Sequence, residues 1–224
     1  LREGWDYVSQ FAPARMLLLL LALVSLVGMP YTVLMPIFAG SVLGGGAHTL
    51  GYLLSAAGAG ALVAAGRLAA RQSVRGLTRV VPQSAALFGI GLVGVGLSRW
   101  LWLSLPMLFV TGLGMMQQMA ATNTILQTVV SEDKRGRVMA FYTMAFVGMA
   151  PWGSLLAGWL AEHVGAPRTL LLDGLVCLLG AGWFAWKLET VREAIRPVYR
   201  KLGIIPEAQA GVQAATTMLT PPED

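Results

Sequence analysis

The sequence has few of the residues on which soluble and metal-binding proteins depend. Only 12% of its 224 residues are charged, whereas a soluble domain carries about 25%. So few charges cannot coat a surface that faces water. Cys177 is the single cysteine, which excludes an intrachain disulfide and a Cys-x-x-Cys metal cluster. We therefore expect no metal site and no cofactor.

Histidine is almost as scarce as cysteine. The two histidines, His48 and His163, lie in connectors between apolar runs, and no His-Glu-x-x-His zinc pair is present. A serine hydrolase needs a base within hydrogen-bond reach of its nucleophile. Ser154 also lacks a G-x-S-x-G context. The sequence therefore predicts a protein that is not an enzyme.

Apolar residues take the place of the missing charges. They make up 56% of the chain, and the mean hydropathy is +0.66. A bilayer core about 30 Å thick requires roughly 20 apolar residues in a helix. A strand pattern does not fit, because the apolar runs show no alternation. Six runs are close to the required length: Met16–Ala39, Leu50–Ala70, Val80–Leu97, Leu101–Val130, Val138–Ala161 and Thr169–Leu188. We expect an all-α integral membrane protein with a bundle of six transmembrane helices over residues 16–188.

The basic residues occupy alternate connectors of this predicted bundle. The connectors before the first span, between the second and third, between the fourth and fifth, and after the sixth hold 14 of the 16 Lys and Arg residues. The other connectors hold only Arg99 and Arg168. The positive-inside rule then places both termini in the cytoplasm and the protein in the cell inner (plasma) membrane. The basic residues form no patch with interleaved aromatics, so we expect the lipid bilayer and no nucleic acid as a partner.

Two segments flank the predicted spans. Residues 1–15 are expected to form a cytoplasmic, interfacial segment, because Trp5, Val8 and Ala12 recur at helical spacing. Residues 189–224 are expected to form a cytoplasmic tail that is largely disordered after 205. The chain starts at Leu1 without an initiator Met or a cleavable leader, which suggests a fragment of a longer protein.

The connector after the second predicted span carries a resemblance. Residues 66–75 resemble a loop motif of the major facilitator superfamily, approximately G-x-L-a-D-R-x-G-R-R. The motif Asp is replaced by Ala70, and the second motif Gly is replaced by Ser73. Four residues match the motif: Gly66, Leu68, Arg71 and Arg75. Arg67 is a further basic residue of this loop.

A second connector, residues 123–139, resembles the loop between the tenth and eleventh helices of the drug and siderophore exporter branch of that superfamily. Its motif residues are Arg135, Gly136 and Arg137. Residues 34–39 and 151–158 resemble the same branch, so that the likeness covers residues 1–190. The resemblance implies that the chain is the C-terminal half of a twelve-helix bundle whose N-terminal six-helix half is missing. It also implies alternating access about a site near the bilayer midplane and proton-driven efflux.

Polar, aromatic and sulfur-containing side chains gather in the first, fourth and fifth predicted spans. Together they suggest a cavity for a small amphipathic, uncharged or cationic substrate, because thioethers adapt to varied ligands. Hydrogen bonds between helices, worth about 0.6 kcal/mol each, are the alternative interpretation. The cavity candidates are Tyr31, Met35, Gln117, Gln118, Thr122, Asn123, Tyr142, Met149 and Trp152. Pro30 and Pro36 break the first span, which can then bend as a gate.

Asp173 is the one acidic residue well inside an apolar run. Charge inside a span suggests function, so Asp173 is a candidate carrier of the coupling proton. Two alternatives remain open. The outer end of the sixth span favours an acid through the helix dipole, and Arg168 is close enough in sequence to pair with it.

Other functional classes fit the sequence less well than a transporter. Four arginines recur every fourth residue, as in a voltage sensor, but only Arg67 borders a span, so a cytoplasmic anchor is the ordinary interpretation. The alternative to a transporter half is a non-catalytic six-helix membrane scaffold or a self-assembling half-transporter.

Overall fold

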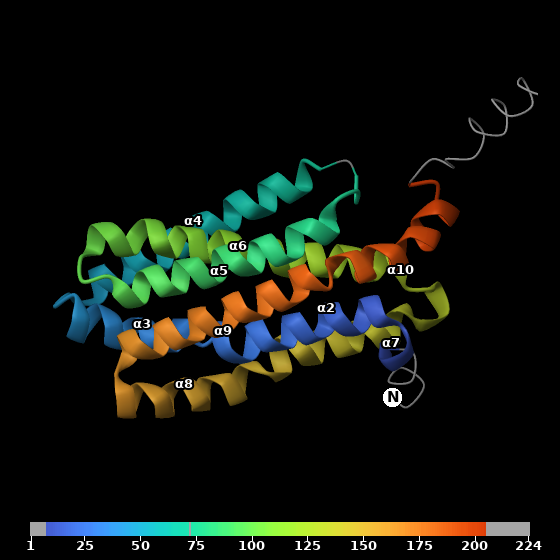
Figure 1. The fold of residues 1–224 in the computed structure, drawn as a ribbon. Coiled ribbons are helices and arrows are strands. Elements are labelled where there is room, and N and C mark those ends of the chain that lie inside the picture. Colours follow the sequence, from blue (N-terminus) through green and yellow to red (C-terminus); the bar gives the residue numbers. More distant parts are fainter. Residues whose placement is uncertain (1–7, 72, 205–224) are drawn as a thin grey trace, which may run out of the picture.

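The structure, a computed structural model, describes residues 8–71 and 73–204. Every regular element within these ranges is a helix, and the long helices lie side by side in one elongated bundle (Figure 1). The all-α prediction is therefore confirmed. The first seven residues, with Trp5 of the predicted interfacial segment, and the predicted disordered tail from residue 205 on lie outside the described residues.

Two of the long helical stretches are interrupted and the others are continuous. The first stretch runs through α2 (Ala12–Leu23), the π-helical η1 (Val24–Gly28), α3 (Tyr31–Ile37) and the π-helical η2 (Phe38–Val42). The continuous helices are α4 (Ala47–Ala69), α5 (Leu77–Leu97), α6 (Leu101–Val129) and α9 (Ala166–Trp186). The second interrupted stretch consists of α7 (Glu132–Thr143), the π-helical η3 (Met144–Gly148) and α8 (Ala150–Val164).

Five helical stretches of the described residues are long and apolar enough to cross a membrane: Ala12–Val42, Ala47–Ala69, Leu77–Leu97, Glu132–Val164 and Ala166–Trp186. They coincide with five of the six predicted spans. The remaining prediction, Leu101–Val130, coincides with α6, which has 29 residues and is therefore about 43 Å long. The amide side chains in its second half make α6 less apolar than the other five stretches. Like them it belongs to the bundle, because it packs along both α4 and α5.

Glycines bring four helices into backbone contact. A Cβ atom on Gly112 of α6 would overlap the carbonyl group of Ala57 in α4, and one on Gly91 of α5 would lie 2.8 Å from the carbonyl oxygen of Met107 in α6. Gly89 of α5 and Gly174 of α9 face each other, so that a Cβ on Gly89 would lie 2.8 Å from the carbonyl oxygen of Gly174. Small residues allow this close approach. We call α4, α6, α5 and α9 the glycine-packed frame.

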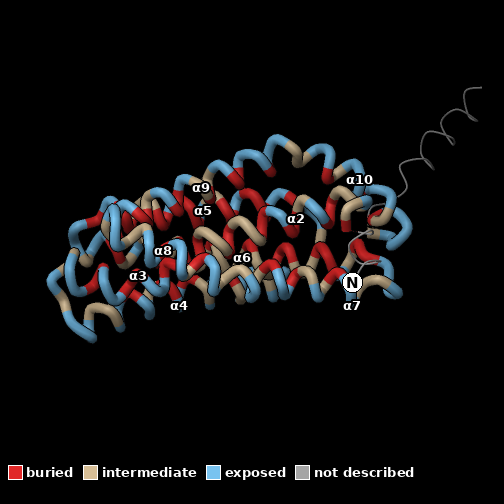
Figure 2. Tube along the Cα trace, turned by 90° about the horizontal axis from the view of Figure 1, so that it is seen from below, coloured by how far each residue is buried: buried red, intermediate tan, exposed pale blue. Residues whose placement is uncertain are grey.

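A further helix, α10 (Leu188–Lys201), lies beyond the spans, where the sequence predicted only a cytoplasmic tail. Val191, Ile195 and Tyr199 recur every fourth residue and are buried. They form the face with which α10 packs against the ends of α2, α5 and α6. Figure 2 shows the same alternation of buried and exposed positions along the long helices.

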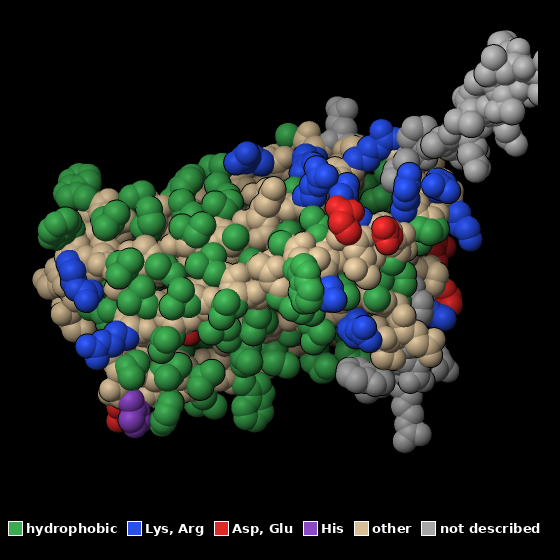
Figure 3. All heavy atoms as spheres, in the orientation of Figure 1, with side chains coloured by type: hydrophobic (Ala, Val, Ile, Leu, Met, Phe, Trp, Pro, Cys, Tyr) green, Lys and Arg blue, Asp and Glu red, His purple; other side chains and the backbone are tan. Residues whose placement is uncertain are grey.

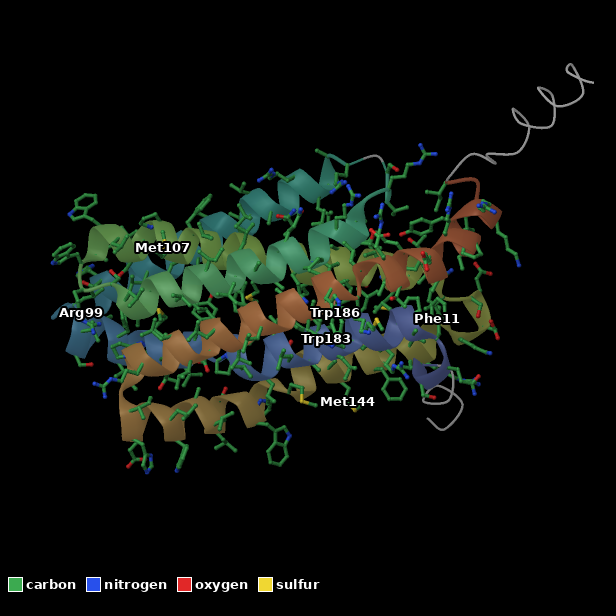
Figure 4. All side chains as sticks on the ribbon, in the orientation of Figure 1. Phe11, Arg99, Met107, Met144, Trp183 and Trp186 are labelled. Carbon is green, nitrogen blue, oxygen red and sulfur yellow. The ribbon has the colours of Figure 1, made fainter. Side chains whose placement is uncertain are left out.

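The two ends of the bundle differ in charge. Figure 3 shows most Lys, Arg, Asp and Glu side chains at the end that carries α10, with apolar side chains over the middle of the visible face. Several exposed tryptophans lie near the ends of helices, with Trp100 and Trp102 at the start of α6 and Trp186 at the end of α9. Trp183 and Trp186 lie on α9 toward the α10 end, whereas Arg99 lies at the opposite end (Figure 4). Tryptophan prefers this interfacial level of a membrane.

Candidate functional site

The predicted cavity residues differ in how far they are buried. Five of them are buried inside the bundle: Tyr31, Met35, Gln118, Thr122 and Tyr142. The other four are partly or fully exposed: Gln117, Asn123, Met149 and Trp152. The structure therefore brings the first set into the packed interior and leaves the second set on the surface of the bundle.

The polar residues of α6 divide between these two positions. Gln118 and Thr122, one helical turn apart, are 1% and 0% exposed. The Nε2 atom of Gln118 and the Oγ1 atom of Thr122 have no hydrogen-bond partner among the described residues. On the more exposed side, Gln127 Nε2 donates to Asn123 Oδ1 at 2.7 Å. Interhelical hydrogen bonding, the alternative to a cavity, therefore does not account for the two buried groups.

Aromatic residues attach the interrupted helices to the frame. The Tyr142 hydroxyl of α7 donates to the Met119 carbonyl of α6 at 3.2 Å. The Tyr31 ring of α3 meets the Phe88 ring of α5 edge-on, with 6.2 Å between ring centroids. Met35, which is 0% exposed, packs in the same interior. These three predicted site residues hold helices together.

Two of the three helix interruptions, η1 and η3, lie next to each other. A Cβ atom on Gly153 of α8 would overlap the carbonyl group of Leu26 in η1 and would lie 2.7 Å from Cγ of Pro30. η1 also contacts η3. Interruptions of this kind leave backbone carbonyls without their helical partners and allow a helix to bend. The sequence predicted breaks at Pro30 and Pro36. Pro30 lies between η1 and α3, whereas Pro36 lies inside α3, just before η2. The break at η3 was missed. Gly148, the last residue of η3, and Pro151, near the start of α8, were the available signal.

Asp173 lies on the frame helix α9, beside the close contact of Gly174 with Gly89. Its side chain is 3% exposed, and its Oδ2 atom has no hydrogen-bond partner in the part of the chain that the structure describes. It is the eighth residue of α9, beyond the first turn where the helix dipole acts most strongly. Arg168 is exposed, and no ion pair joins it to Asp173 among the described residues.

The first loop motif forms a turn at the basic end of the bundle. The Arg75 backbone N–H donates to Ser73 Oγ at 3.1 Å, and Arg71 Nη2 donates to the Arg75 carbonyl at 3.1 Å. The Arg75 Nε–H donates to the Ile204 carbonyl just after α10. Gly76 follows with a φ of +78°, a left-handed conformation that favours glycine. Gly66 and Arg67 are exposed at the end of α4.

The second loop motif lies in the first turns of α7. Arg135 Nη1 and Glu132 Oε1 are 3.7 Å apart, with 40% and 90% of their side chains exposed, so this pair contributes little to stability. Gly136 and Arg137 are exposed. A Cβ atom on Gly136 would meet no atom within 4 Å.

Comparison with known proteins agrees with this architecture. Residues 1–197 match the family described as "Transmembrane secretion effector". A Staphyloferrin A transporter of Staphylococcus aureus (strain NCTC 8325 / PS 47) is 27% identical over 183 residues, which make up 80% of this chain and 45% of that protein. The chain thus spans a little under half the length of this curated relative. It is a multi-pass membrane protein that belongs to the transmembrane secretion effector family of the major facilitator superfamily.

Proposed function

We propose that the chain is the C-terminal six-helix half of a secondary active transporter that works by alternating access. The observation that carries this proposal is the contact between the interrupted helices beside a closely fitted frame. A frame joined by backbone contacts moves as one body, whereas π-helical breaks concentrate bending at a few residues. Such an arrangement suits a half-bundle that rocks against a second one.

The exposed helices support a missing N-terminal half as the partner. In the most apolar 18-residue segment of α4, only 22% is buried, and the corresponding share is 17% in Glu132–Val164. In α5 it is 61%. Gly51, Gly58 and Gly158 lie on these two exposed stretches, and a Cβ atom on any of them would meet nothing within 4 Å. Small exposed residues permit another helix to approach closely. The length of the curated relative leaves room for six more helices.

The exposed polar side chains of α6 support a small amphipathic, uncharged or cationic substrate. Gln117 and Asn123 are partly exposed on this helix. The Lys and Arg residues of the described spans lie near span ends, so this half offers no cation at the midplane to a substrate with several negative charges. The name of the relative gives the substrate of that protein, Staphyloferrin A.

Asp173 is our candidate for proton coupling, and efflux by antiport is the direction we propose. A carboxylate without a counter-ion is costly in a low-dielectric interior. In this proposal Asp173 takes up a proton while it is enclosed and releases it when its surroundings become wetter. Both termini lie in the cytoplasm in this proposal, with the protein in the cell inner membrane.

Transport by the full-length protein in inside-out membrane vesicles tests the proposal. A pH gradient with an acidic vesicle lumen should drive accumulation of a fluorescent amphipathic cation such as ethidium inside the vesicles. A protonophore should abolish this accumulation. Gln117→Leu should lower uptake several-fold, whereas Gln10→Leu, which removes the same amide from an exposed position before α2, should not. Vesicles that show no gradient-dependent uptake of any amphipathic cation, neutral drug or zwitterion would favour the membrane scaffold.

Asp173→Asn separates coupling from binding. The variant keeps the size of the side chain but cannot exchange a proton. Substrate exchange without a gradient should continue, while uptake driven by the pH gradient should fall to the level of protonophore-treated vesicles. Gradient-driven uptake at the wild-type rate would remove Asp173 from the mechanism.

A further inference from the structure

Two hollows lie toward the basic end of the bundle, one between the start of α5 and α10 and the other along α5 and α9. The first has a volume of about 540 Å³ and is lined mainly by polar residues, among them Arg75, Thr78, Arg192, Arg196 and Tyr199. The second has a volume of about 420 Å³ and is largely apolar. It runs along α5 and α9 from Arg79 and Leu188 toward the middle of the bundle.

The change from apolar to polar lining occurs at the level of the membrane interface. Leu188 lines the apolar hollow, and Glu189, the next residue, lines the polar one. Trp186 is 77% exposed immediately before this point, and Lys187 Nζ lies 4.4 Å from the centroid of its ring. Tryptophan and lysine mark the headgroup level of a bilayer. The polar hollow therefore lies at headgroup depth and the apolar hollow at acyl-chain depth.

The charges around the polar hollow favour an anion. The two hollows together are lined by four arginines and two glutamates. Arg192 Nη1 and Glu189 Oε1 are 2.6 Å apart and offset each other. Arg196 makes no ion pair with another described residue. α5 begins here after Gly76 without a side-chain cap, so the positive end of its dipole adds to the field.

Tyr199 supplies an independent observation. Its side chain is 6% exposed, it lines the polar hollow, and its hydroxyl has no hydrogen-bond partner among the described residues. Burial raises the pKa of this hydroxyl above its ordinary value of 10.0, so it stays protonated and can donate. A buried donor without an acceptor is costly, so a small side-chain shift that brings a ligand oxygen to this enclosed hydroxyl would be favourable.

We propose that the two hollows together bind one anionic phospholipid. Its phosphate lies against Arg75, Arg196 and the Tyr199 hydroxyl, and one acyl chain lies in the groove between α5 and α9. Residues adjacent in the chain line the polar and the apolar hollow. This arrangement favours a lipid over soluble phosphate, which would leave the apolar hollow unused. Glu193, which also lines the polar hollow, accepts hydrogen bonds and so suits a headgroup that carries hydroxyls, such as glycerol.

Native mass spectrometry of the full-length protein in detergent tests the site. Phosphatidylglycerol should bind more tightly than phosphatidylethanolamine with the same acyl chains. Arg196→Gln should weaken phosphatidylglycerol binding by about five-fold, the effect typical of one basic residue, and Tyr199→Phe should also weaken it. Arg200→Gln, an exposed neighbour on α10 that does not line either hollow, should have no effect. Equal loss with Arg196→Gln and Arg200→Gln would overturn the proposal.

A second variant distinguishes a lipid from a soluble anion. Gly182 lines the apolar hollow, and a Cβ atom there would meet nothing within 4 Å, so Gly182→Leu adds an apolar side chain at the groove from a backbone position with free space. Phosphatidylglycerol binding should fall several-fold, and the melting temperature without lipid should not change. Inorganic phosphate should neither compete with the lipid nor raise the melting temperature. Equal protection by phosphate, or wild-type lipid binding in Gly182→Leu, would contradict the proposal.

Discussion

Thr111 and Thr122 show how a single hydrogen bond separates a structural residue from a candidate functional one. Both lie on α6 and both are 0% exposed. Thr111 Oγ1 donates to the Met107 carbonyl at 2.8 Å, as is usual for a threonine inside a helix. Thr122 Oγ1 has no partner among the described residues. A hydroxyl that stays unsatisfied in the packed interior suggests a partner that arrives during the working cycle.

Valine at these two positions should therefore have opposite effects on stability. Thr122→Val removes an unsatisfied buried hydroxyl and should stabilise the protein by about 1 kcal/mol, whereas Thr111→Val removes a satisfied one and should destabilise it by about 1 kcal/mol. Unfolding of the purified protein in detergent, followed by temperature or denaturant, measures both. A matching loss of stability in the two variants would mean that Thr122 is already hydrogen-bonded in the resting state.

At the scale of the helices, the glycines of the frame are not equivalent. Gly112→Ala should push α6 from α4, because the added Cβ would overlap the carbonyl group of Ala57. Overpacking of this kind destabilises by about 1–3 kcal/mol. Gly58→Ala, on α4, places its Cβ in open space and should be neutral or slightly stabilising through helix propensity. Melting temperatures in detergent compare the two. Equal melting temperatures would show that the α4–α6 contact adjusts freely.

The long helices could be predicted from the sequence because the bilayer sets their length. The predicted start of the third span, Val80, lies three residues from the observed start of α5 at Leu77. α10 could not be predicted in this way, because it is not an apolar run of bilayer length. Charged residues lie between its three buried ones, which become buried only through packing against the bundle. The membrane gives no length requirement to a helix that lies outside it.

The candidate site was only partly predictable for a related reason. The sequence places Gln117 and Gln118 side by side, but consecutive residues on a helix point about 100° apart. One of them is buried without a partner for its Nε2 atom, and the other is partly exposed. Spacing along one helix identifies a polar cluster, whereas the neighbouring helices decide which of its members face a cavity.

At the scale of the whole molecule, the bundle has one strongly charged end and one weakly charged end (Figure 3). The turn of the first loop motif, the start of α7 and α10 lie at the charged end, and their basic residues outnumber those of the opposite end. Because translocation of positive charge is disfavoured, the charged end should remain in the cytoplasm. This orientation also fixes the membrane leaflet, the cytoplasmic one, in which the proposed lipid would bind.

Cysteine labelling tests this orientation with little background, because Cys177 is 0% exposed. Four exposed residues are suitable for single substitutions: Ser73→Cys and Ser131→Cys at the charged end, and His48→Cys and Glu162→Cys at the other. In right-side-out vesicles, a membrane-impermeant maleimide should label the His48 and Glu162 variants at once. It should label the Ser73 and Ser131 variants only after the vesicles are opened, since their side chains lie behind a bilayer that the reagent cannot cross.

Labelling of Ser73→Cys and Ser131→Cys from opposite sides would mean that an odd number of helices separates the two loops. The pairing of α5 with α6 as antiparallel spans would then be wrong, and with it the half-transporter.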